Sequence, residues 1–148
     1  MTKNSAVDVV LAVLTSVERR DRDRLGLYHP QIEFRWPPSL PYGGAFRGEA
    51  EVGMMVKHFG EIWNPLQPTP EERRLDPRVV AIGEEGRVVV NYIWRGLDQQ
   101  KRRFETETLA EYQVRDGMLA RAQMFYFDLV GLASFLEGAG IVVTKKSS

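Results

Sequence analysis

Hydrophobic residues in the first half of the chain recur with the period of an α-helix. Over 6–19 they fall three or four positions apart, which predicts a helix with Asn4 or Ser5 as its N-cap. A polar block after it leaves room for a short second helix over 23–28. A third helix is predicted over 49–63, where the apolar residues again occupy one face: Val52, Met55, Phe59, Ile62 and Trp63.

The second half of the chain changes to a period of two, which is typical of β-strands. Strands are predicted over 79–82, 87–95, 104–114 and 118–127. Asp116 and Gly117 indicate a tight hairpin between the last two strands, since both residues tolerate a positive φ. A closing helix is predicted over 129–137, ended by Gly138 and Gly140. Helices followed by an antiparallel sheet indicate one α+β domain that spans residues 1–148.

The segment EFRWPPSLPYGGAFRG, residues 33–48, combines aromatic residues with prolines. A strand over 31–36 should end at Pro37, because proline cannot donate to a sheet ladder. The extended loop that follows is expected to form the aromatic lip of an apolar pocket, together with residues of the strand: Phe34, Trp36, Tyr42 and Phe46. Residues 64–78 contain several prolines and are expected to form a long surface loop.

The amino-acid composition excludes several classes of partner and site. A chain of 148 residues with 43% hydrophobic content can form one domain with its own core. Basic and acidic residues balance at 20 each, so no nucleic-acid partner is expected. No cysteine and only two histidines argue against disulfides and a metal site, and no cofactor is expected. The apolar run over 6–17 lacks the features of a signal peptide and is too short to span a membrane, so a soluble, cytoplasmic protein is expected. The tail, residues 141–148, is expected to be disordered.

Three segments carry a family resemblance through their order and spacing: VLTSVERRD, FRWPPSLPYGGAFRGEAEV and YQVRDGMLARAQMFYFD. Over about residues 6–138 the chain resembles the NTF2-like superfamily, and within it the SnoaL-like branch related to ketosteroid isomerase. The resemblance implies a cone of about three N-terminal helices packed on a curved, mostly antiparallel sheet, with a short C-terminal helix. It also implies a deep apolar cavity open at one end, and a homodimer formed through the outer face of the sheet.

The acid–base residues of two enzyme groups in this family are replaced here. Ketosteroid isomerases carry a general-base Asp where this chain has Trp36. The Tyr and Asn of limonene-epoxide hydrolases correspond to Phe34 and Trp36, and their Arg and Asp correspond to about Asn91 and Ile93. Many relatives carry a His at the position of Ala110. Neither known catalytic set is present, so whether the protein is an enzyme stays open.

Asp128 remains the best catalytic candidate, because SnoaL-type cyclases use an Asp as acid or base. Tyr112 or Tyr126 would then donate a hydrogen bond to a developing enolate. The alternative for Asp128 is the N-cap of the closing helix, where its carboxylate accepts backbone amides. His58, at the edge of the inward face of the third helix, is interpreted as a surface residue.

Alternation assigns faces to some strands and leaves others open. In the strand over 104–114, Thr108 and Tyr112 share the face suited to a cavity, whereas Glu107 and Leu109 face outward. Leu109 and Leu119 are expected on the outer, dimer-forming face. In the strand over 87–95, Tyr92 and Trp94 could line the cavity or pack at a dimer interface: alternation alone does not choose.

The expected ligand is a hydrophobic small molecule, aromatic or polycyclic, bound in the apolar cavity and acted on by an isomerase or cyclase reaction. The alternatives are a non-catalytic ligand-binding protein and a dimeric association module. The residues expected to bind the ligand are Leu14, Phe34, Trp36, Tyr42, Phe46, Met55, Phe59, Trp63, Asn91 and Thr108.

Overall fold

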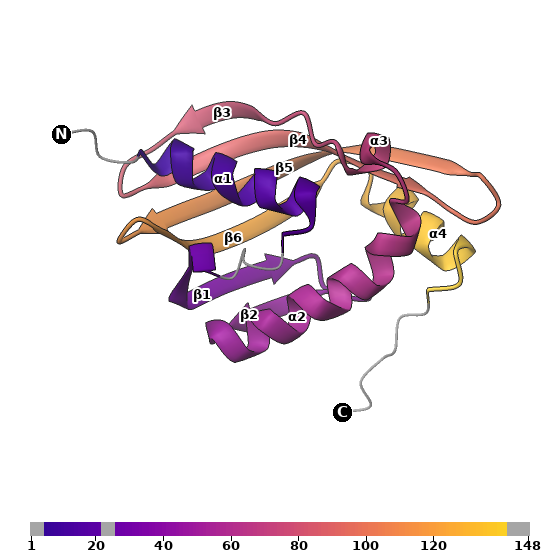
Figure 1. The fold of residues 1–148 in the computed structure, drawn as a ribbon, viewed down its shortest axis with the longest axis horizontal. Coiled ribbons are helices and arrows are strands. Elements are labelled where there is room, and N and C mark those ends of the chain that lie inside the picture. The colour runs from indigo at the N-terminus through magenta and orange to yellow at the C-terminus, as the bar shows by residue number, and fades with distance from the viewer. Residues whose placement is uncertain (1–4, 22–25, 142–148) are drawn as a thin grey trace.

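The computed structural model describes residues 5–21 and 26–141. Its helices and strands, in chain order, are α1 (Ala6–Arg19), β1 (Tyr28–Trp36), β2 (Gly44–Arg47), α2 (Gly48–Trp63), η2 (Asn64–Leu66), α3 (Pro70–Arg73), β3 (Arg78–Ile82), β4 (Arg87–Leu97), β5 (Arg103–Arg115), β6 (Met118–Tyr126) and α4 (Leu129–Gly138) (Figure 1). Residues 23–25, half of the short helix predicted over 23–28, lie outside the described residues, and Tyr28 belongs to a strand. The tail beyond Ile141 also lies outside them.

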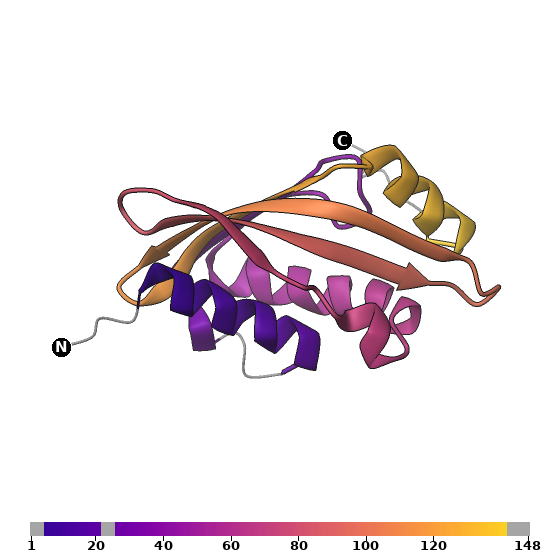
Figure 2. The same ribbon diagram turned by 90° about the horizontal axis from the view of Figure 1, so that it is seen from above.

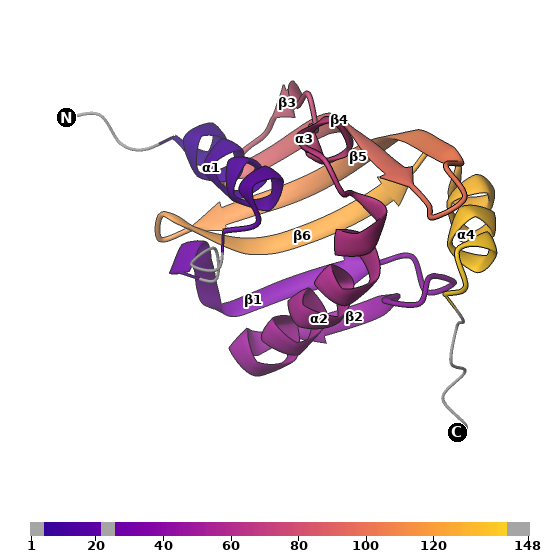
Figure 3. The same ribbon diagram turned by 45° about the vertical axis from the view of Figure 1, so that its right-hand side comes forward.

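The strands form one curved sheet in the order β2-β1-β6-β5-β4-β3. Neighbours are antiparallel except β1 and β6, which are parallel and pair Phe34 with Ala122. Figures 2 and 3 show α1, α2 and α3 on one face of the sheet, with α4 at the end of the long strands. Helix α1 covers β4, β5 and β6, and α2 covers β1 and β2. The predicted α+β class with a mostly antiparallel sheet is confirmed.

Helix α1 begins and packs for reasons that are visible in its sequence. The Ser5 hydroxyl accepts a hydrogen bond from the amide of Asp8, and the Asp8 carboxylate accepts one from the amide of Ser5. This reciprocal capping box satisfies two amides that the first helical turn leaves free. The apolar face of the helix then buries Val10, Val13 and Leu14 against the sheet. No helix among the described residues is long and apolar enough to cross a membrane.

The prediction of a surface loop over 64–78 is wrong, because this segment contains η2 and α3 and buries Leu66 and Leu75. Thr69 is the N-cap of α3, and its amide and hydroxyl donate to Oε1 of the buried Glu72 at 2.8 and 2.9 Å. A proline occupies the first position of this helix, where its fixed φ suits the helical turn and its missing amide is not needed. Pro65 and Pro70 therefore lie in the first turns of η2 and α3.

The two faces of β5 follow the predicted alternation, with Thr108 buried and Glu107 and Leu109 exposed. Strand β6 departs from alternation near its start, because a register shift against β5 leaves both Leu119 and Ala120 buried. The prediction that Leu119 lies on the outer face is therefore wrong, whereas Leu109 lies on that face as predicted.

Candidate ligand-binding site

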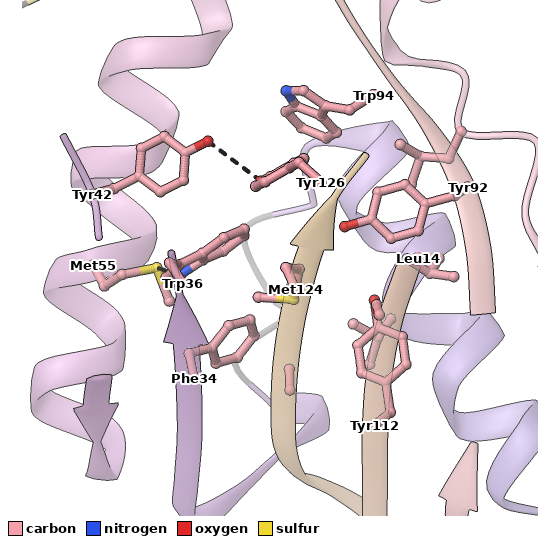
Figure 4. Close-up of a cluster of buried hydrophobic side chains, with 14 of the residues drawn as sticks. Leu14, Phe34, Trp36, Tyr42, Met55, Tyr92, Trp94, Tyr112, Met124 and Tyr126 are labelled. Carbon is pink, nitrogen blue, oxygen red and sulfur yellow. Dashed lines mark hydrogen bonds between the residues drawn. The ribbon is translucent and has the colours of Figure 1, made fainter. Parts of the chain in front are cut away.

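A cavity of about 60 Å³ lies between the concave face of the sheet and helices α1 and α2. Helices α1 and α2 and strands β1, β4, β5 and β6 all contribute to its lining, as does Leu75 from the segment after α3. The lining residues are Val13, Leu14, Val17, Tyr28, Phe34, Trp36, Met55, Val56, Phe59, Leu75, Tyr92, Trp94, Tyr112, Met124 and Tyr126. Figure 4 shows how side chains from β1, α2 and β4 approach one another around Met124 and Tyr126 of β6.

Trp36 is the centre of the aromatic wall of this cavity. Its ring centroid lies 5.1 Å from that of Phe59, with the two planes nearly parallel, and 6.5 Å from that of Tyr126. Tyr42 packs edge-on against the same indole at 5.1 Å. The indole N–H of Trp36 donates to the sulfur of Met55 at 3.1 Å, so the one polar hydrogen of this side chain has a partner inside an apolar site. Sequence-distant aromatics thus hold Trp36 in a defined orientation.

All five tyrosines of the chain are buried, and they supply the polar groups of this region. The hydroxyls of Tyr42 and Tyr126 are 3.3 Å apart, and Figure 4 shows the hydroxyl of Tyr112 pointing toward Tyr92. Burial raises the pKa of Tyr92, and it raises the pKa values of Tyr112 and Tyr126 well above that of a free phenol. These side chains therefore stay neutral and able to donate a hydrogen bond.

The cavity lining contains no aspartate, glutamate, histidine, lysine or arginine among the described residues. A neutral phenol can donate a hydrogen bond to a carbonyl or an oxyanion, but it is a weak proton acceptor. The arrangement can thus bind and polarise an acceptor group. It does not by itself provide a general base.

The cavity lining contains part of the predicted aromatic set. Phe34, Trp36 and Phe59 line the cavity, and so do two of the other expected binding residues, Leu14 and Met55. The candidates Tyr112 and Tyr126 also line it.

The other expected binding residues lie outside the cavity lining. Tyr42 and Trp63 are buried directly behind Phe59, with ring centroids 4.9 and 6.4 Å from it. Phe46 lies on β2, at the edge of the sheet. Thr108 is fully buried on the cavity-side face, yet neighbouring side chains cover it.

Asn91 points away from the cavity, and its Nδ2 lies 3.5 Å from Oε1 of the exposed Glu107. Because alternate residues of β4 face the helices, Tyr92 and Trp94 point inward and Asn91 points outward. This resolves the ambiguity in the sequence: Tyr92 and Trp94 line the cavity. Both residues were missing from the expected binding set, although their shared face was visible as an alternation of apolar residues.

Asp128 is an exposed N-cap of α4, and it does not line the cavity. Its Oδ1 accepts a hydrogen bond from the amide of Gly131 at 2.8 Å. Its own amide donates to the hydroxyl of Thr106 at 3.0 Å, which fixes the turn between β6 and α4. The capping alternative raised by the sequence is confirmed. His58 is exposed on α2, as interpreted.

The cavity is smaller than the space that ligand sites usually provide, which is about 300–1,000 Å³. Its volume of about 60 Å³ holds no more than a few water molecules. The aromatic rings that were expected to surround a ligand instead fill most of the cone themselves. A polycyclic ligand therefore requires side chains to move.

No family model and no curated protein matches the sequence. Solved structures do share its architecture. TerC co-crystallized with polyporic acid is 22% identical and has a TM-score of 0.73, with 89% of this chain and 98% of that chain covered. A protein of unknown function with a cystatin-like fold from Xanthomonas campestris is 20% identical, with a TM-score of 0.74 and the same coverage of 89% and 98%.

An NTF2-like protein from Burkholderia xenovorans LB400 is 24% identical and has a TM-score of 0.69, with 90% of this chain and 97% of that chain covered. At such identities the likeness establishes the arrangement of helices and strands, and it carries no residue roles. The order of elements, the curved mixed sheet and these structures agree with the resemblance read from the sequence. The chain therefore has the NTF2-like fold.

Proposed function

We propose that this protein binds a small aromatic molecule with a hydrogen-bond acceptor, such as a ketone, in the cavity between α1, α2 and the sheet. One observation carries the proposal: the phenol side chains of Tyr92, Tyr112 and Tyr126, which stay neutral, line a cavity whose remaining lining is mostly apolar. Apolar walls with a few convergent polar groups are typical of small-molecule sites. TerC, which shares the fold, was co-crystallized with polyporic acid, and this adds support.

Binding requires the cavity to enlarge, and its lining contains side chains suited to that. Met55 and Met124 are unbranched and flexible, and they can change rotamer more easily than a branched or aromatic side chain. Phe59 is only partly buried, so it can swing toward the surface of α2. Part of the binding free energy is spent on this rearrangement, and the affinity is correspondingly reduced.

Matched ligands test the role of the hydroxyls. The aromatic ketone 2-acetonaphthone should bind about three- to tenfold more tightly than 2-ethylnaphthalene, because a neutral hydrogen bond in a buried site contributes about 0.5–1.5 kcal/mol. Trp36 and Trp94 line the cavity, so tryptophan fluorescence reports occupancy. Tyr112→Phe should reduce the preference for the ketone. Equal affinities for the two ligands would contradict the proposal.

Two adjacent methionines provide a matched pair of variants that tests the location. Met55 is 3% exposed and lines the cavity, whereas Met54 is 75% exposed on the other face of α2. Met55→Phe should weaken binding of 2-acetonaphthone by at least about tenfold, because a rigid ring then occupies the cavity. Met54→Phe should leave binding unchanged. Similar losses in both variants would place the ligand elsewhere.

In a catalytic version of this proposal, Tyr112 and Tyr126 are better candidates than Asp128, because they could donate a hydrogen bond to a carbonyl that becomes an enolate. Asp128 is a weaker catalytic candidate, since its carboxylate caps α4 and the residue does not line the cavity. The non-catalytic binding protein is therefore the function that we favour over an isomerase or cyclase. Asp128→Asn should leave the affinity for 2-acetonaphthone unchanged. A large loss would instead assign the carboxylate to the site.

We also propose that two copies associate through the outer face of the sheet. Leu109 and Phe125 are paired neighbours on this face and both are exposed. Ion pairs of Arg95 with Glu105 and of Arg121 with Glu111 lie on the same face, so apolar residues are bordered by polar ones.

Sedimentation tests this association. The wild-type mass should be about twice 16.9 kDa at micromolar concentration. Phe125→Glu should reduce the mass to that of one chain, whereas Met54→Glu, on the exposed face of α2, should not. A wild-type protein that sediments as a single chain would contradict the dimer.

A further inference from the structure

A second, larger space lies on the outer side of the sheet, where β1 ends beside β6. This groove has a volume of about 390 Å³, within the range of small-molecule sites. The loop after Trp36 and the start of α4 close its sides. Trp36, Met124 and Tyr126 line both the groove and the inner cavity, so these three residues form the wall between them.

The groove exists because β1 and β6 separate at their ends. Their parallel pairing extends to Arg35 and Gln123. Beyond Trp36 the chain has Pro37 and Pro38, which cannot donate to the sheet ladder, and it turns away from β6. Strand β6 continues to Tyr126, so the space between the two segments is left without a strand.

The polar groups around the groove are hydrogen-bond donors. Arg35 lines it and is exposed, and no carboxylate among the described residues pairs with its guanidinium. The side-chain oxygen of Gln123 accepts a hydrogen bond from Arg121 at 2.9 Å, so the side-chain NH₂ of Gln123 remains available as a donor. No acidic residue lines the groove among the described residues. The groove therefore contains the positive charge of Arg35 and the amide donor of Gln123, and no anionic side chain among the described residues lines it.

The remaining walls are largely apolar. They are formed by Pro37, Pro38, Phe125 and Leu129, together with one side of Trp36. Phe125 is 48% exposed, which leaves much of an aromatic ring in contact with water unless something covers it. A planar apolar molecule can cover these walls while a negative group reaches Arg35.

We propose that the groove binds a planar aromatic carboxylate, with the carboxylate on Arg35 and the side-chain NH₂ of Gln123 and the ring system between Phe125 and the two prolines. A guanidinium matches a carboxylate in charge and in its paired donors. The site is separate from the cavity assigned to the neutral aromatic ligand. It does not depend on that assignment.

The charge requirement is tested with 2-naphthoate and 2-naphthamide, which differ in charge but hardly in shape. Calorimetry should show that wild-type protein binds the naphthoate about five- to tenfold more tightly than the amide. Arg35→Gln should remove this preference. Arg115→Gln removes the same charge from the exposed β5–β6 hairpin, and it should retain the preference. Equal effects of the two substitutions would overturn the proposal, because they would indicate only a general charge effect.

The position of the ligand is tested by chemical-shift changes in ¹⁵N-labelled protein. Addition of 2-naphthoate should shift the amides of Ala45, Phe125 and Leu129, which lie at the groove. Shifts confined to Val13 and Leu75 would place the ligand in the inner cavity and overturn the proposal. Tyr112→Phe, a change in the lining of the inner cavity alone, should not alter naphthoate binding, so failure of the cavity proposal is distinguishable from failure of this one.

Phe125 also belongs to the outer face through which we propose that two copies associate, so a second copy is the competing occupant of the groove. Naphthoate affinity that falls as the protein concentration rises, together with dimer formation, would show that a second copy covers the groove. That result would overturn the carboxylate site. Affinity that is independent of protein concentration supports it.

Discussion

The buried tyrosines make the stability of this protein sensitive to alkaline pH. Burial raises the pKa values of Tyr42, Tyr92, Tyr112 and Tyr126. In the unfolded chain a tyrosine loses its proton near pH 10. Below about pH 10 both states hold these protons, and the tyrosines add no pH dependence. Above it the folded state binds more protons than the unfolded state, so the unfolding free energy must fall as the pH rises.

The size of the effect follows from the number of buried phenols. Each group that ionises only on unfolding lowers the unfolding free energy by about 1.4 kcal/mol per pH unit above its unfolded pKa. Four such groups together give a slope of about 5.5 kcal/mol per pH unit. A domain of this size is typically stable by about 5–15 kcal/mol, so it should unfold cooperatively within about one to three pH units above pH 10.

Two signals followed during one alkaline titration test this reasoning. Tyrosinate absorbance reports ionisation of the phenols, and far-ultraviolet circular dichroism reports folding. The two transitions should coincide, because the tyrosines ionise when the chain unfolds. Tyrosinate that appears gradually near pH 10 while the circular dichroism stays native would refute the burial on which the argument rests.

Urea unfolding at several alkaline pH values gives the slope directly. Tyr112→Phe removes one titrating group and should reduce the slope by about 1.4 kcal/mol per pH unit. Thr108→Val is the matched control, because it removes a buried hydroxyl that does not titrate in this range. That hydroxyl has no hydrogen-bond partner among the described residues, so the control should cost little stability. A slope that is the same in wild-type protein and Tyr112→Phe would contradict the assignment of this residue.

Three further substitutions have defined outcomes in urea unfolding. Asp128→Ala should lower the unfolding free energy by about 1 kcal/mol, because the first turn of α4 loses its cap. Gly86→Ala should cost at least about 2 kcal/mol more than Gly117→Ala: the two glycines have φ of 75° and 72°, but only at Gly86 would a Cβ meet the carbonyl oxygen of Val114, at 2.1 Å. Leu75→Ala should cost about 2–5 kcal/mol, since this side chain is 1% exposed and lines the cavity.

Local patterns in the sequence determined much of the secondary structure. The spacing of apolar residues predicted α1 and α2, and α1 also carries its own capping residue, Ser5. The Asp116-Gly117 hairpin and the Asp128 cap were predictable for the same reason, because each depends on the chemistry of a few adjacent residues. Alternation in β5 correctly separated its buried face from its exposed one.

Features that depend on pairing between distant segments were not predictable. The short edge strand β2 forms because it pairs with β1, and its four residues carry little pattern of their own. A register shift between β5 and β6 moved Leu119 from the expected outer face into the core. The segment 64–78 folded into helical turns because its apolar residues are covered by the rest of the molecule, whereas its prolines alone suggested a loop.

Some features of the candidate site were likewise predictable from the sequence, and others were not. The sequence by itself indicated that Phe34, Trp36 and Phe59 gather at one place, because their elements present apolar faces with few alternatives for burial. Only the tertiary structure decided that Tyr92, and not Asn91, faces the cavity, and that Asp128 caps a helix. It also decided how much space remains, since the volume depends on how side chains from seven segments interdigitate. Periodicity specifies which residues share a face, but packing between elements specifies what that face meets and how tightly.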